Sequence, residues 1–94
     1  LRKYVEVHAD DARAIRAFID AKDFESAQRC AHSLKGSSGA IGAVHVHATA
    51  SRLDAALRHH AAMGELLPIV DELGIDLAEV VGAAQRLPSE VGAP

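Results

Sequence analysis

The spacing of apolar residues constrains the fold of this chain more than any other feature of its sequence. Between residues 23 and 42, apolar or small side chains recur at steps of three and four, at Phe24, Ala27, Ala31, Leu34, Ser38 and Ile41. Since an α-helix has 3.6 residues per turn, these side chains share one helix face. We expect this helix to bury that whole face, to begin after Asp23 as its N-cap, and to fray between Gly39 and Gly42.

Three further segments show the same helical spacing. The first covers residues 9–20, and the apolar residues before it either extend that helix or form a shorter one. The next runs from about residue 43 to residues 63–64. The last runs from residue 65 to residues 87–88, with Pro68 in its first turn, where proline is tolerated. Four amphipathic helices with short connections predict an all-α, antiparallel four-helix bundle with up-down-up-down topology.

Composition supports this fold class and excludes several kinds of protein. Alanine, a strong helix former, accounts for 19 of the 94 residues, and no alternating β-branched run indicates a sheet. No apolar stretch approaches the roughly 18 residues of a membrane span. The net charge of −3 does not indicate the basic surface that nucleic-acid binding requires. Cys30 is the only cysteine, so we expect no disulfide framework and a reducing compartment.

The length predicts a single domain, which we place over residues 1–88. The polar residues 89–94 are expected to form a disordered tail. The first residue is Leu rather than Met and no signal-peptide pattern follows it, so we expect the chain to be cut from a longer protein.

His32 is the candidate for chemistry, because it lies on the polar face of the second predicted helix. Lys35 and Gly36 follow at i+3 and i+4, so they flank the imidazole on that face. A glycine inside a helix costs about 0.5–1 kcal/mol relative to alanine, so Gly36 must serve another purpose. Its missing side chain clears the approach of a partner's backbone, and Lys35 supplies positive charge to an anion. This arrangement fits an imidazole that accepts a phosphoryl group from another protein.

The stretch around His32 resembles the motif of the histidine-containing phosphotransfer (HPt) domain of bacterial multistep phosphorelays. That motif reads His-x-Leu-Lys-Gly, followed by small residues and a second Gly-Ala. The matching residues here are His32, Leu34, Lys35, Gly36, Ser37, Ser38, Gly42 and Ala43. The likeness continues upstream in residues 22–24 and downstream in residues 52–54, and covers roughly residues 4–86.

The resemblance implies a phosphocarrier function in a two-component phosphorelay. A receiver domain with a phosphoaspartate would dock over His32, the imidazole would become phosphohistidine, and the group would pass to a second receiver's aspartate. The domain would bind no cofactor and have no ATP-dependent activity of its own, because the Mg²⁺ belongs to the receiver. It would be a monomer without nucleic acid or membrane contact, and meet receivers in cis and in trans.

The same resemblance implies a parent chain. We expect a cytoplasmic module of a hybrid sensor histidine kinase anchored in the bacterial inner membrane, with a free-standing phosphotransfer protein as the alternative. Two other functions compete with phosphotransfer: the dimerisation and phosphoacceptor domain of a histidine kinase, and a helical interaction module without chemistry. Ser33 and Gly36 fit the kinase domain poorly, because that family has an acidic residue directly after its histidine and a Thr or Asn where Gly36 stands.

Two more residues are candidates for phosphate binding or docking. Gln28 shares the polar face with His32. Asp54 occupies a position where the family often has Glu or Gln near the phosphohistidine, and its shorter side chain leaves two alternatives, orienting His32 or remaining a solvated acid.

The remaining polar residues are expected to be structural. The other histidines, His8, His45, His47, His59 and His60, are predicted to lie on the surface. Their spacing does not suit a metal site, so no metal is expected. Cys30, Ser37 and Ser38 are predicted to be small packing residues.

Overall fold

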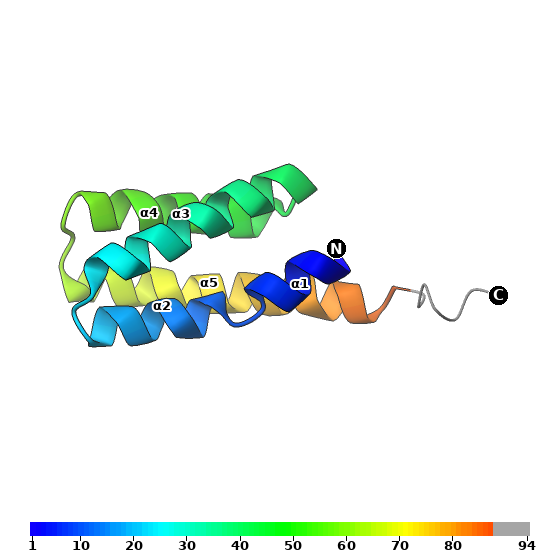
Figure 1. Cartoon of the computed structure of the whole chain (residues 1–94), viewed down its shortest axis with the longest axis horizontal. Coiled ribbons are helices and arrows are strands. Elements are labelled where there is room, and N and C mark those ends of the chain that lie inside the picture. Colours follow the sequence, from blue (N-terminus) through cyan, green and yellow to red (C-terminus); the bar gives the residue numbers. More distant parts are fainter. Residues whose placement is uncertain (88–94) are drawn as a thin grey trace.

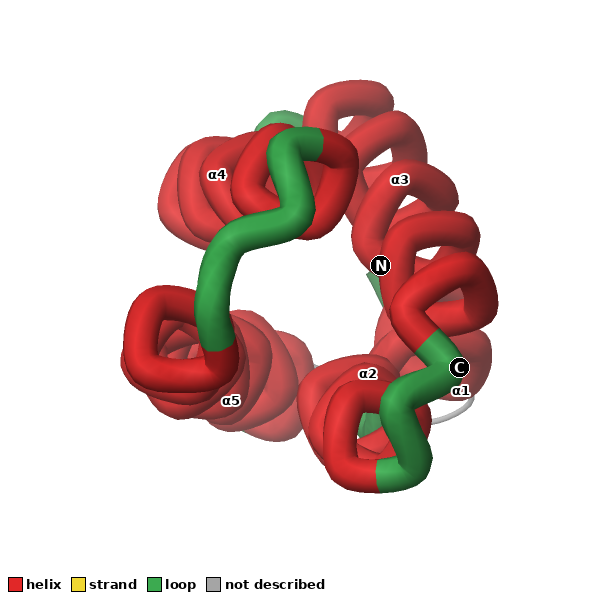
Figure 2. The backbone as a smooth tube through the Cα atoms, turned by 90° about the vertical axis from the view of Figure 1, so that its left-hand side faces the viewer, coloured by secondary structure: helices red, strands yellow, loops and turns green. Residues whose placement is uncertain are grey.

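A computed structural model describes residues 1–87, which form five α-helices and no strand (Figure 1). The helices are α1 Arg2–His8, α2 Asp11–Asp20, α3 Phe24–Ile41, α4 Val44–Arg58 and α5 Met63–Gln85. α1 lies beyond the end of α2, where it packs on α5 (Figure 1), whereas α2, α3, α4 and α5 surround a common centre when the molecule is seen from one end (Figure 2). Each of these four helices packs on its two neighbours in the ring. The predicted antiparallel four-helix bundle is confirmed.

The residues before the first predicted helix form a helix of their own. Ala9 and Asp10 separate α1 from α2. Tyr4 is buried, and its hydroxyl lies 2.7 Å from Ser38 Oγ, which joins α1 to α3. His8 was expected on the surface, and that prediction is wrong, because its ring stacks near Tyr4 and its Nδ1 lies 2.6 Å from Asp11 Oδ2.

α3 begins after Asp23 as predicted, but it stays helical to Ile41, so the fraying expected from Gly39 onward is not observed. Asp23 Oδ1 accepts a hydrogen bond from Ser26 N at 3.2 Å, and Gly42 ends the helix with a left-handed φ of 76°. The expectation that the whole apolar face is buried is wrong at its two ends. Phe24 and Ile41, in the first and last turns of α3, are 38% and 43% exposed.

The connection between α4 and α5 lies earlier than predicted. α4 ends at Arg58 because His60 adopts a left-handed φ of 57°, and Ala61 N then donates to Ala56 O. α5 begins at Met63, so Pro68 falls in the second turn of that helix rather than in the first. The left-handed residue at position 60 is a histidine rather than a glycine, so the sequence carries no signal for it. The predicted end of α4 is therefore too late in the chain.

The core is aliphatic and runs along the centre of the bundle. Leu34, Leu53 and Leu73 are fully buried as expected, one each from α3, α4 and α5. Burial of such side chains, at about 25 cal/mol per Å² of apolar surface, holds together helices that are marginally stable in isolation.

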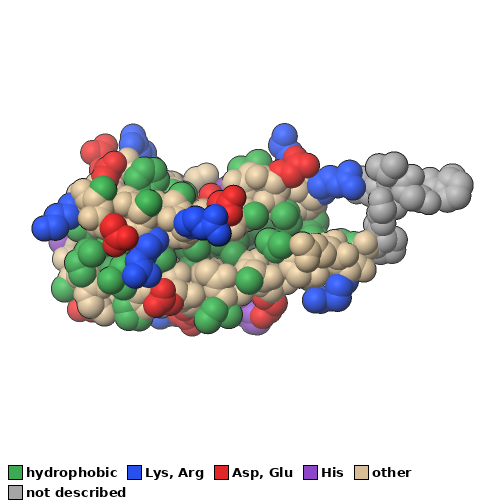
Figure 3. Space-filling view, turned by 90° about the horizontal axis from the view of Figure 1, so that it is seen from below, with side chains coloured by type: hydrophobic (Ala, Val, Ile, Leu, Met, Phe, Trp, Pro, Cys, Tyr) green, Lys and Arg blue, Asp and Glu red, His purple; other side chains and the backbone are tan. Residues whose placement is uncertain are grey.

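The side of the bundle that carries α2 and α5 mixes acidic, basic and apolar side chains (Figure 3). Arg16 Nη1 reaches Asp71 Oδ1 at 3.2 Å across these two helices. Within the described residues, no helix combines the length and the apolarity that crossing a membrane requires. The predicted tail, residues 89–94, lies outside the described residues.

Candidate functional site

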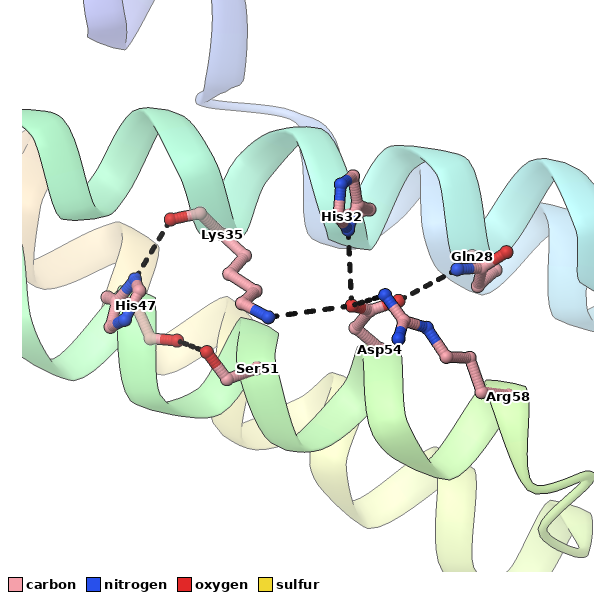
Figure 4. Close-up of polar contacts among 7 residues, drawn as sticks. All are labelled: Gln28, His32, Lys35, His47, Ser51, Asp54 and Arg58. Atoms are coloured by element: carbon pink, nitrogen blue, oxygen red, sulfur yellow. Dashed lines mark hydrogen bonds and ion pairs between the residues drawn. The ribbon is translucent and has the colours of Figure 1, made fainter.

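His32 lies on α3, and its ring faces Asp54 on the neighbouring helix α4 (Figure 4). Its side chain is 61% exposed. Ala31 and Leu34, which flank it in the sequence, are fully buried and hold this part of α3 against the bundle. The imidazole is thus accessible to another molecule while the backbone that carries it is fixed by packing.

Asp54 of α4 lies at the centre of the site, and its side chain is only 2% exposed. Gln28 Nε2 donates to Asp54 Oδ1 at 2.9 Å, and His32 Nδ1 lies 3.3 Å from Oδ2 (Figure 4). The alternative of a solvated acid is therefore wrong for Asp54. Its side chain is long enough to reach His32 because α3 and α4 pack directly on each other.

Two cations approach the same carboxylate. Lys35 Nζ lies 3.9 Å from Asp54 Oδ2, and Arg58 Nη2 donates to that oxygen at 3.1 Å. Lys35 and Gln28 were both expected at the site, and the structure places them there. Arg58 was missed, although its i+4 spacing from Asp54 on a predicted helix is a signal for such an ion pair.

The environment of Asp54 keeps its carboxyl group ionised. Burial raises the pKa of Asp54, but the hydrogen bonds from Gln28 and His32 lower it. The charge of Arg58 acts in the same direction, and the resulting pKa lies below the ordinary value. At neutral pH the carboxylate therefore has only acceptor oxygens, which determines where the proton of the His32 contact must be.

The contact with Asp54 selects one tautomer of His32. Because an ionised carboxylate accepts and does not donate, the proton of the 3.3 Å contact belongs to Nδ1. In the neutral imidazole, Nε2 then carries the free lone pair. An exposed imidazole with a lone pair on Nε2 is a nucleophile, and the adjacent carboxylate stabilises the positive charge that develops on the ring when Nε2 attacks an electrophile.

Gly36 leaves open space one turn beyond His32. A Cβ atom built at this position would meet no other atom within 4 Å, and the residue is exposed. Its φ angle is not positive, so neither packing nor backbone conformation requires a glycine here. The absence of a side chain beside an exposed nucleophile is consistent with the expected approach of a partner.

His47 departs from the expectation of a surface residue. It is half-buried, and its Nδ1 lies 2.9 Å from the Lys35 carbonyl oxygen. His45, His59 and His60 are exposed as expected, and His45 pairs with Glu79. Among residues 1–87, no group of three or more His, Cys, Asp or Glu side chains is arranged to hold a metal ion.

The small residues of α3 contribute packing. Ser38 is fully buried against Tyr4, and Ser37 and Cys30 are half-buried. Burial and, to a lesser extent, the charge of Asp11 raise the pKa of the Cys30 thiol to about 11, so this thiol stays protonated and unreactive at neutral pH.

Similarity to a known family covers nearly the whole chain. The family model described as Hpt domain matches residues 1–86, a range that includes every residue of the site. No curated protein and no solved structure matches the chain.

Proposed function

This chain belongs to the Hpt domain family, and we propose that His32 is the residue on which it carries a phosphoryl group in a phosphorelay. The family match supports a phosphotransfer module in general. We choose His32 because its Nδ1 contacts the buried Asp54 carboxylate. This contact leaves the lone pair on Nε2 of an exposed ring. No other histidine among the described residues combines this exposure with a buried carboxylate partner.

The proposed step is an in-line transfer from a receiver domain's phosphoaspartate. Nε2 of His32 forms a bond to phosphorus as the bond between phosphorus and the aspartate oxygen breaks, and the leaving electron pair restores the receiver's carboxylate. The product is a phosphoimidazolium that keeps its proton on Nδ1 against Asp54. Transfer to a second receiver reverses these bond changes. Mg²⁺ is expected on the receiver, and this domain supplies positioning and charge.

Charge around His32 suits an anionic group. Lys35 and Arg58 carry two positive charges against the single negative charge of Asp54, so the side chains at the site have a net charge of about +1 when His32 is neutral. Phosphoryl oxygens near Nε2 would therefore meet attraction rather than repulsion. Gly36 keeps the approach to this position free for the receiver.

The experiment is to incubate the domain with a receiver charged with ³²P-labelled acetyl phosphate. Wild-type protein should acquire an acid-labile, base-stable phosphate, and His32→Gln should acquire none while keeping the wild-type circular dichroism spectrum. His45→Gln is the matched control, because His45 is an exposed helical histidine that also contacts a carboxylate. Label on the His32→Gln variant would overturn the proposal. Receiver binding without transfer would instead favour a pure interaction module.

We further propose a setting for this module. Its receivers would include one in the same polypeptide, as in a hybrid sensor histidine kinase, and one in a separate protein, all in the bacterial cytoplasm. The isolated domain is proposed to be monomeric, and light scattering after size exclusion tests this directly. An obligate dimer would favour the dimerisation and phosphoacceptor domain of a kinase.

A further inference from the structure

We propose that His47 is a positioning residue for phosphotransfer. Gly39 of α3 leaves the space that the His47 ring occupies, because it has no side chain. His47 would act by fixing the part of α3 from which the Lys35 side chain leaves the helix. This inference rests on the proposed function of His32, and it concerns His47, which lies outside the motif, and Gly39, one of the small residues within it.

The contact itself joins α4 to the backbone of α3. His47 Nδ1 lies 2.9 Å from the carbonyl oxygen of Lys35, with the ring half-buried between the helices (Figure 4). A carbonyl oxygen has no proton to give, so His47 Nδ1–H is the donor. Within a helix this oxygen already accepts from the N–H of residue 39, and the His47 bond is therefore an additional one directed across the helix interface.

Gly39 is the residue that makes this contact sterically feasible. Side chains in an α-helix tilt toward its N-terminus, so the side chain of residue 39 would cover the turn that contains residue 35. A Cβ atom at Gly39 would lie 3.1 Å from His47 Nδ1 and 3.3 Å from its Cε1. Such distances are tighter than ordinary carbon contacts, so with an alanine here the ring would have to shift by a few tenths of an ångström, which weakens its bond to the carbonyl.

Lys35 is thereby held from α4 at both of its ends. His47 and Asp54 are seven residues apart, which is close to two helical turns, and so they face α3 from the same side of α4. His47 binds the Lys35 carbonyl, and Asp54 lies 3.9 Å from its Nζ. The bond therefore fixes the point at which the Lys35 side chain leaves α3, and with it the position of Nζ beside Asp54.

The contact can be tested by a double-mutant cycle on thermal stability, independently of any partner. Gly39→Ala should lower the melting temperature of the wild type, because the methyl group displaces the His47 ring. In the His47→Ala background the same substitution should raise it by a few degrees, because alanine is the better helix former. Gly36→Ala is the matched control, since it lies in the same helix with open space around it, and should raise stability equally in both backgrounds. Equal effects of Gly39→Ala in both backgrounds would overturn the proposal.

The positioning role is tested by the rate at which the receiver's phosphoryl group is transferred. His47→Ala should slow transfer about fivefold, equivalent to ~1 kcal/mol. In a Lys35→Ala background the additional effect should shrink to less than twofold, because the side chain that the bond positions is gone. His47→Asn, whose amide can donate to the same carbonyl, should restore most of the rate, whereas His47→Leu should not.

The outcomes separate this inference from the proposed function. If the wild type transfers phosphate and His47→Ala does so equally fast, the positioning role is overturned and the function of His32 stands. If the effect of His47→Ala is undiminished in the Lys35→Ala background, His47 does not act through Lys35 and the inference is again overturned. A wild-type domain that accepts no phosphate overturns the proposed function and this role with it, while the stability cycle still measures the contact.

Discussion

Asp54 Oδ2 lies 3.3 Å from His32 Nδ1, across the interface between α4 and α3. The aspartate is almost completely buried and the histidine is largely exposed, so the pair has one end in the bundle and the other in solvent. The ionised carboxylate binds Nδ1 on the buried side of the ring. The nucleophilic Nε2 is therefore on the side that faces solvent.

Asp54→Asn should slow phosphate acceptance about tenfold, or ~1.4 kcal/mol, because an amide no longer offsets the positive charge that forms on the His32 ring. The geometry should persist, since Asn is nearly the same size. Asp76→Asn is the control, because Asp76 accepts a hydrogen bond from Thr49 between α4 and α5 away from His32. Single-turnover transfer from a labelled receiver gives both rates. An unchanged rate in Asp54→Asn would mean that the carboxylate charge plays no part.

Asp54 should also contribute to the pH dependence of folding. Its pKa is lower in the folded chain than in the unfolded one, so its stabilising effect is complete above about pH 4, the ordinary value for an unfolded aspartate. That effect is lost as the pH falls through the folded pKa. Urea midpoints measured between pH 7 and pH 2 should therefore decline less steeply below pH 4 in Asp54→Asn than in the wild type. Parallel curves would contradict this prediction.

Gly36→Gln should leave the fold intact and slow transfer by at least about tenfold. The new side chain would point into open space, and glutamine has a higher helix propensity than glycine, so stability should stay level or rise slightly. Ala40→Gln provides the comparison, because Ala40 is exposed in the last turns of the same helix. Wild-type transfer by Gly36→Gln would show that the receiver does not pass over this position.

Lys35→Ala and Arg58→Ala should each slow acceptance without abolishing it, because each removes one of the two positive charges beside Asp54. We expect a loss of about three- to tenfold for each, and a weaker dependence of the rate on salt. Arg13→Ala, which removes an 87% exposed arginine on α2, should change neither quantity. The check is the transfer rate measured over a range of ionic strength, and equal salt dependence in all variants would argue against a role for these charges.

Local sequence was sufficient to predict that the chain is helical and that His32 lies on the polar face of α3. The apolar spacing of α3, its Asp23 cap and the left-handed Gly42 are properties of neighbouring residues, and they define the helix whichever partner it packs on. His32, Lys35 and Gly36 share a polar face for the same reason, since residues three and four apart lie side by side on a helix.

Features that depend on how two helices pack on each other were not predictable from local sequence. Phe24 and Ile41 belong to the apolar stripe of α3 but remain partly exposed at its two ends, and the spacing of the stripe does not show how far the neighbouring helices cover them. α4 stops at Arg58 through a left-handed conformation at His60, a residue type that gives little warning of it.

The chain's sequence by itself determined an all-α bundle with one exposed histidine in a phosphotransfer motif. Only the tertiary structure decided that Asp54 reaches His32, that Arg58 joins them, and that His47 binds the Lys35 carbonyl. The physical reason is the distance along the chain over which each kind of interaction acts. Helix formation and amphipathicity arise from residues within one or two turns, whereas these contacts depend on the separation and rotation of α3 against α4, which the packing of the whole core sets.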